Sequence, residues 1–277
     1  MNEENYTAET DASIIDFVNK NIIRHTVQLF RKGKKRLQPF GSSVFVKLYD
    51  SYFFFTASHV ADYFENNENS DLYIRVGKKR FVNVLGEIKY TDIKKSGGID
   101  LAYIKIDSQL IGPLLGPYIP IEVNKIRSHH NLLNAMNYCV FGYPEVNISK
   151  EGEEFDTYAT LYLTSPSKDN VYTYYGYKKK DTIVVEVSGK GKDIRTNLKS
   201  PVNTHFYGIS GCGLWLMLLH FNELEKRTEV DYRLVGIMTE FKKGKFFCLA
   251  GNKIHLLIEA LEAIEQFKFK EIPIAYS

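Results

Sequence analysis

Two series of short, strand-like apolar runs lie on either side of a segment rich in proline and glycine in this 277-residue chain. The segment covers residues 107–131 and has the composition of a linker. The runs do not alternate with helical patterns, which argues against a doubly wound α/β fold. Many short strands separated by turns instead predict two antiparallel β-barrels or sandwiches. The runs cover residues 25–30, 43–48, 52–57, 72–76, 81–84 and 101–106, then residues 138–141, 157–164, 170–177, 182–187, 213–219, 233–238 and 246–250.

A helix is predicted near each end of the chain. Asp11 can cap a helix whose apolar residues have helical spacing and which ends near Arg24. Asn252 can cap an amphipathic helix that continues to about Phe267. The expected fold class is therefore all-β, with two antiparallel barrels of about six strands each and a helix at either end. The expected domains are an N-terminal helical extension (residues 1–24), a first β-barrel (25–120) and a second β-barrel with the C-terminal helix (121–277).

Composition narrows the class of protein further. The net charge is only +3, which does not require a nucleic acid as partner. The three cysteines are widely spaced and form no CxxC pair, which argues against a disulfide scaffold and a zinc site. The N-terminal stretch has no signal-peptide pattern, and the longest apolar run, residues 214–219, is too short to span a bilayer. We therefore expect a cytoplasmic protein in a reducing compartment, with no cofactor, metal or membrane contact.

Three short fragments carry residue types that work together in acyl transfer. They are TASHV with His59, GGIDLAY with Asp100 and YGISGCGLW with Ser210. Each alone is common in structural positions, because a strand-end histidine, an aspartate after glycines and a serine between glycines all occur in ordinary turns. Together they supply a base, a carboxylate that orients the base, and a nucleophile. The glycines around Ser210 allow a sharp turn whose backbone N–H groups can face an oxyanion.

The same fragments resemble the sequence boxes of the trypsin-like (chymotrypsin-fold) serine peptidases, especially the bacterial or cytosolic members without disulfides. TASHV is similar to the T-A-A-H histidine box, GIDLAYIKI to the aspartate box D-L/I-A-L-L-K-L, and GISGCGLW to the serine box G-D/N-S-G-G-P-L. The stretches GSSVFV, VFGYP and VGIMT agree with the family at further strands. The resemblance covers residues 25–268, almost the whole chain.

The resemblance implies a serine endopeptidase that cleaves polypeptides through an acyl-enzyme. Ser210 is then the nucleophile, His59 the general base and later the general acid, and Asp100 the residue that holds the histidine tautomer. The N–H groups of Gly208 and Ser210 would form the oxyanion hole. Substrate-binding roles fall on Thr204, Thr239 and Phe241.

Several positions depart from the family pattern. Ile209 replaces an aspartate that pairs with a newly cleaved N-terminus in secreted members, so we expect no activation by an N-terminal ammonium. Cys212 could be a rival nucleophile, but related cysteine enzymes have glycine where this chain has Ser210, so Cys212 is interpreted as a small packing residue. Thr204 is not acidic, so cleavage after lysine or arginine is not supported. Phe241 lies near the rim of the pocket and would narrow it.

Two other classes of protein share some of these features. An α/β-hydrolase needs the motif G-x-S-x-G and a βαβ rhythm, and this chain has Cys212 at the last motif position and no such rhythm. A protease-fold module that binds without cleaving remains open, because Ile209 and Cys212 are unusual. An activating protein partner also remains open, and relatives of this type in bacterial stress and antiviral defence provide a hypothesis for the biological role.

Overall fold

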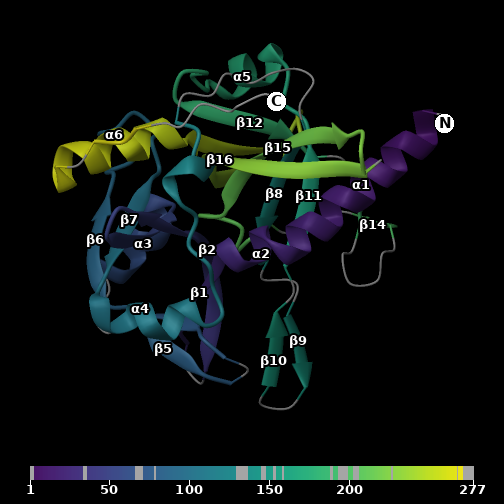
Figure 1. The fold of residues 1–277 in the computed structure, drawn as a ribbon. Helices are drawn as coiled ribbons and strands as arrows, with labels where there is room; N and C mark the ends of the chain where they lie inside the picture. The colour runs from purple at the N-terminus through teal and green to yellow at the C-terminus, as the bar shows by residue number, and fades with distance from the viewer. Residues whose placement is uncertain are drawn as a thin grey trace.

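The computed structural model describes residues 3–33, 36–65, 71–77, 79–128, 137–144, 148–151, 154–157, 159–187, 190–192, 199–201, 206–225, 227–266 and 268–270. Two curled antiparallel sheets dominate it, with helices at both ends (Figure 1). The predicted fold class is therefore confirmed. Among the described residues, no helix is long and apolar enough to cross a membrane.

The first sheet has seven strands in the order β5-β4-β1-β2-β3-β7-β6. Strand β6 was not predicted, which is why this sheet has one strand more than expected. The hairpin predicted at residues 49–51 joins β2 to β3 in antiparallel register. The strands are β1 (Thr26–Lys32), β2 (Leu37–Leu48), β3 (Ser51–Thr56), β4 (Leu72–Arg75), β5 (Phe81–Asn83), β6 (Gly86–Tyr90) and β7 (Ala102–Ile106).

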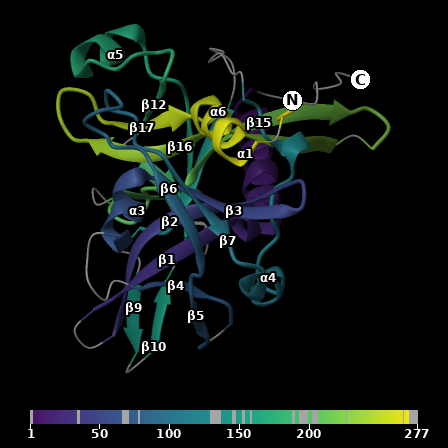
Figure 2. The same cartoon turned by 90° about the vertical axis from the view of Figure 1, so that its left-hand side faces the viewer.

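The second sheet has six strands in the order β11-β8-β15-β16-β17-β12. Figure 2 shows two short hairpin strands, β9 (Ile148–Glu151) and β10 (Glu154–Thr157), which project away from it. A further short pair is β13 (Lys190–Lys192) with β14 (Lys199–Pro201). The six strands are β8 (Asn137–Gly142), β11 (Thr160–Thr164), β12 (Thr182–Glu186), β15 (Gly213–Asn222), β16 (Arg227–Lys242) and β17 (Cys248–Lys253).

The strands of the two sheets come from residues 26–106 and 137–253, respectively. The exact domain limits at residues 24/25 and 120/121 stay a prediction. The segment expected to be a linker contains a helix, α4 (Ser108–Leu115), and a 3₁₀ turn at Val123–Lys125. Asp107 caps α4, because its side chain accepts the N–H of Gln109 at 2.9 Å. The sequence contains this cap, but the prolines and glycines of the segment favoured a linker.

Three helix predictions need correction. The N-terminal helix α1 (Glu3–Lys20) begins eight residues before Asp11, so Asp11 lies inside it, and α2 (Ile22–His25) continues beyond a break. Residues 170–177, predicted as a strand, form α5 (Asp169–Tyr175), which ends at Gly176 in the left-handed conformation (φ 73°). The C-terminal helix α6 (Ile254–Glu265) has Lys253, not Asn252, at its N-cap. Helix α3 (Ser58–Glu65) was not predicted.

Three consecutive phenylalanines in β3 pack on both faces of the first sheet. Phe53, Phe54 and Phe55 are all fully buried. Phe54 lies in a cluster within the first sheet, whereas Phe53 and Phe55 lie in the cluster that joins both sheets to α1 and α6. Because close-packed side chains hold a strand in one position, β3 gives the residues that follow it a rigid support.

A buried histidine connects the linker to both sheets. His25 Nδ1 donates to the carbonyl oxygen of Ile119 at 2.6 Å, because a carbonyl can only accept. Its Nε2 therefore accepts the hydroxyl hydrogen of Tyr232, also at 2.6 Å. Burial lowers the pKa of His25 from 6.5 to about 4, so the neutral ring is the folded form at neutral pH.

We expect acid to destabilise the fold through His25. Between pH 6.5 and about 4 the unfolded chain binds a proton at this site and the folded chain does not, so stability falls as the pH is lowered through this window. The loss approaches roughly 3 kcal/mol at the lower end, at about 1.4 kcal/mol for each unit of pKa. Urea unfolding at several pH values would measure it. His25→Gln should flatten the curve in this window, and an unchanged slope would contradict the assignment.

Candidate active site

His59 and Asp100 meet at the ends of two neighbouring strands. Strand β3 ends at Thr56 and leads directly into α3, whose first turn carries His59. Asp100 precedes β7, and Thr56 pairs with Ala102 where β3 and β7 lie antiparallel. His59 Nδ1 donates to Asp100 Oδ2 at 2.7 Å, and the main-chain N–H of His59 donates to Oδ1 at 3.0 Å. The carboxylate therefore fixes both the ring and the tautomer, and Nε2 is left to accept a proton.

Asn252 supports this pair from the second sheet. Its Oδ1 accepts the main-chain N–H of Asp100 at 2.9 Å, and the side chain is buried at the end of β17. The sequence analysis interpreted Asn252 as a helix cap, and nothing local in the sequence connects it to Asp100. The contact joins positions far apart in the chain, so it is visible only in the folded structure.

Ser210 lies in a tight turn between two glycines, Gly208 and Gly211, which both have a positive φ. The N–H of Ile209 donates to the carbonyl of Phe206 at 3.2 Å, with Gly208 at the third position and φ 92°. These are the features of a type II turn, which needs a positive φ at that position. Gly211 has φ 90°, and a Cβ there would lie 2.0 Å from the carbonyl oxygen of Ser42. Both glycines are thus required by the backbone.

Ser42 of the first sheet holds this turn in place. Its N–H donates to the carbonyl of Ser210 at 2.8 Å, and its hydroxyl donates to the carbonyl of Gly208 at 2.8 Å. Thr56 in turn donates its hydroxyl to the carbonyl of Ser42 at 2.8 Å. The loop that carries Ser210 is therefore bound to the same sheet that carries His59.

The backbone N–H groups of Gly208 and Ser210 have no hydrogen-bond partner among the described residues. The N–H groups of Ile209, Gly211 and Cys212 each donate a hydrogen bond. Among the described residues, those of Gly208 and Ser210 donate none, although both residues line a cavity. Paired, unsatisfied donors beside a serine form the arrangement that binds a developing oxyanion.

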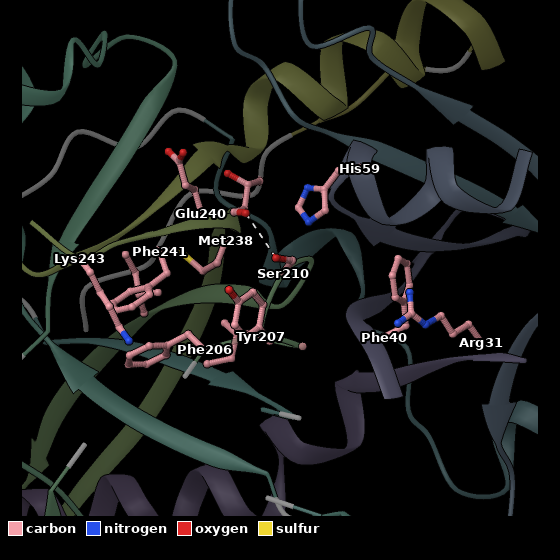
Figure 3. Close-up of a pocket in the computed structure, with 14 residues that line it drawn as sticks. Arg31, Phe40, His59, Phe206, Tyr207, Ser210, Met238, Glu240, Phe241 and Lys243 are labelled. Atoms are coloured by element: carbon pink, nitrogen blue, oxygen red, sulfur yellow. Dashed lines mark hydrogen bonds between the residues drawn. The ribbon is translucent and has the colours of Figure 1, made fainter. Parts of the chain in front are cut away.

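The hydroxyl of Ser210 rests on Thr239 in this structure. Ser210 Oγ donates to the carbonyl of Thr239 at 3.4 Å, the bond drawn as a dashed line in Figure 3. No hydrogen bond among the described residues joins Ser210 to His59, although both line the same cavity. In substrate-free sites catalytic hydrogen bonds are often long and tighten only when substrate binds.

The cavity over Ser210 has a volume of about 740 Å³ and an apolar end. Thr239 and Phe241, predicted to bind substrate, both line it, whereas Thr204 lies outside the described residues. The rings of Phe206 and Phe241 are 4.2 Å apart, and Phe247 packs against Phe241 at 4.9 Å. The end of the cavity beside Phe206 and Phe241 is therefore lined by packed aromatic rings.

The neighbours of Ser210 in sequence are core residues. Cys212 is fully buried, does not line the cavity, and has a thiol pKa raised by burial, so it lacks the properties of a nucleophile. Ile209 is also buried, in the apolar cluster of the second sheet. Isoleucine cannot form an ion pair, so apolar packing of Ile209 holds the turn in place. The described residues contain no group of three or more potential metal ligands.

Comparisons with known proteins agree with this architecture. The fold is similar to that of neuropsin, a serine protease expressed in the limbic system of mouse brain, with a TM-score of 0.54, 13% identity, and coverage of 87% of this chain and 94% of that one. It is also similar to the scabies mite inactivated protease paralogue S-I1, with a TM-score of 0.57, 13% identity, and coverage of 89% and 96%. No protein-family model matches the sequence, and neither does any curated protein.

These likenesses show a chymotrypsin-like fold, the fold of trypsin-like serine proteases. At 13% identity they establish the fold alone, and one of the two solved structures is of an inactivated protein.

Proposed function

We propose that the protein is a serine endopeptidase that cleaves polypeptides through an acyl-enzyme. The observation that carries the proposal is the 2.7 Å bond between His59 Nδ1 and Asp100 Oδ2, because His59 lines the same cavity as Ser210. The N–H groups of Gly208 and Ser210, which donate no hydrogen bond to any described residue, add the electrostatic stabilisation of the oxyanion.

The proposed reaction follows from these positions. Ser210 Oγ attacks the carbonyl carbon of the substrate while His59 Nε2 takes the hydroxyl proton. The oxyanion accepts hydrogen bonds from the N–H groups of Gly208 and Ser210. His59 then gives its proton to the departing amine, and water repeats the sequence to release the acid. Asp100 stabilises the imidazolium throughout.

A fluorophosphonate probe tests the proposal directly. Such probes phosphonylate only a serine that is activated as a nucleophile. Mass mapping of the labelled protein should place one adduct on Ser210, and boiling the protein before labelling should remove it. An adduct elsewhere would refute the assignment of the nucleophile.

A protease-fold binding module is the second candidate. The bond from Ser210 Oγ to the carbonyl of Thr239, rather than to His59, favours it. If no adduct forms on Ser210, with or without a cell extract that could contain an activating partner, the binding module becomes the better assignment. Such a partner would act by turning the Ser210 hydroxyl towards His59.

Gly208→Ala is expected to lower kcat by about 10²- to 10³-fold, the usual effect of losing one oxyanion donor. Alanine tolerates φ 92° poorly, so the turn should convert to a type that points the N–H of residue 208 away from the cavity. Steady-state kinetics would measure this. Gly176→Ala is a matched control, because it imposes similar strain at φ 73° outside this cavity. Equal effects on kcat would contradict the oxyanion role.

We also propose a cytoplasmic location. Cys139, Cys212 and Cys248, all the cysteines of the chain, are free and buried, which suits a reducing compartment. Immunoblotting of cell fractions for the tagged protein would test this location, and the protein should be found in the cytoplasmic fraction.

A further inference from the structure

Arg31 occupies the end of the Ser210 cavity opposite to the apolar end. Figure 3 shows Arg31 and Phe40 on one side of Ser210, with Phe241 and Lys243 on the other. Arg31 forms no ion pair with any described residue. Arg233, by contrast, pairs with Asp231 at 2.6 Å. A cation that lines a reactive cavity without a carboxylate partner is available to a ligand.

Aromatic contacts from two other elements fix the position of this guanidinium. Its central carbon lies 4.8 Å from the ring centroid of Phe40 and 5.3 Å from that of Tyr63. The two rings also contact each other, with centroids 4.6 Å apart. Stacking of this kind holds a guanidinium by its face, so the N–H groups at its edge stay free to donate.

The backbone directs Phe40 into this arrangement. In the pairing of β1 with β2, Leu29 is opposite Gly41 and Phe30 is opposite Pro39, so Phe40 is the extra residue of a β-bulge. A bulge turns the side chain of the extra residue away from its regular direction. Tyr63 comes from α3, the helix whose first turn carries His59. The site of Arg31 is thus built on the same helix as the catalytic base.

The edge of a guanidinium fits a carboxylate, with two parallel hydrogen bonds. Among the described residues that line the cavity, only Glu240 carries a carboxylate. Glu240 is already bonded to the hydroxyl of Tyr177 and the ammonium of Lys242. The carboxylate of a ligand would fit this edge.

We infer that Arg31 binds a carboxylate of the substrate on the leaving-group side of the scissile bond. The inference rests on the proposed function, and it places the acyl side chain at the end of the cavity with Phe206 and Phe241. The amine then departs past His59 towards Arg31. The carboxylate belongs either to an aspartate or glutamate after the cleavage site or to a free C-terminus close to it.

Peptide binding and cleavage can be measured in parallel. The first set of quenched fluorescent peptides has a variable, uncharged residue before the expected scissile bond. Each peptide carries either Glu or Gln at the first, second or third position after that bond, and each ends in an amide. A second set has Gln throughout and ends in a free carboxylate. Cleavage gives kcat/KM for the parent, and fluorescence anisotropy gives affinity for Ser210→Ala, which cannot cleave. The amide and acid sets distinguish a side-chain carboxylate from a terminal one.

We expect one peptide with a carboxylate to be preferred by about tenfold, and up to about 100-fold, as for a hydrogen bond to a charged group. Arg31→Gln should remove the preference, and Arg31→Lys should retain only part of it, because an ammonium lacks the planar edge. Lys243→Gln is the matched control, because it removes a cation from the other end of the same cavity. It should leave the preference intact.

Three outcomes would overturn the inference: no preference in the parent, a preference that survives in Arg31→Gln, or an equal loss in Lys243→Gln. Circular dichroism and melting temperature confirm that each variant is folded. The binding measurements with Ser210→Ala remain decisive for Arg31 even if the parent cleaves nothing, so failure of the proposed function and failure of this inference give different results.

Discussion

Ser210→Ala is expected to abolish peptide hydrolysis, with kcat lower by roughly 10⁶-fold, while the fold survives. The hydroxyl is part-buried and makes one weak hydrogen bond, at 3.4 Å to the carbonyl of Thr239. Its loss therefore removes the nucleophile at little cost in stability. The turn keeps its backbone bonds to Ser42, which do not involve the hydroxyl of residue 210. The rate of hydrolysis of casein or of a peptide mixture would measure the loss of activity. Equal melting temperatures for the variant and the parent would show that the fold survives.

Cys212→Ala is the control for that experiment. The thiol is fully buried beside the turn, so its removal changes packing rather than chemistry. We expect turnover within about tenfold of the parent, together with a modest loss of stability from the small cavity. If Cys212→Ala lost activity while Ser210→Ala retained it, the nucleophile would have been assigned to the wrong residue.

Asp100→Asn should lower kcat by about 10⁴-fold, the effect described for the same change in another member of this fold. Asp100 accepts two N–H groups of His59, one from the ring and one from the main chain. An amide has only one oxygen to accept with, and its NH₂ group favours the tautomer in which Nε2 carries the proton. His59 would then be unable to take the proton of Ser210.

Asp92→Asn is the matched control, because Asp92 is the next candidate carboxylate in the sequence. Its Oδ1 accepts the N–H groups of Lys94 and Lys95 within its own loop, and these contacts lower its pKa. We expect its substitution to leave kcat unchanged. Turnover like that of the parent in Asp100→Asn, with a large loss in Asp92→Asn, would transfer the orienting role to Asp92.

The strands and the His–Asp pair could be predicted from the sequence because their signals are local. Short apolar runs define β3 and β7, and His59 and Asp100 lie within three residues of the ends of these strands. Helix α5 was wrongly predicted as a strand, because valine and tyrosine favour strands in general. Its burial of Val171 and Tyr172 against Val184 and Cys248 decides the outcome, and such packing is not visible in a short window.

The supporting residues of the site could not be predicted for a related reason. Asn252 and Ser42 each bond to a segment of the other sheet, across more than 150 positions of sequence. Arg31 lies against Phe40 because a bulge turns Phe40 towards it. No motif records these contacts, since each depends on how two sheets pack together.

The two hydrogen bonds from Ser42 to the loop of Ser210 also tie the two sheets together at this point. They attach the loop to the strand β2 of the first sheet, and β2 pairs with β3, the strand that leads into the helix of His59. A relative displacement of the two sheets would therefore have to stretch or break these two bonds before the loop could leave Ser42.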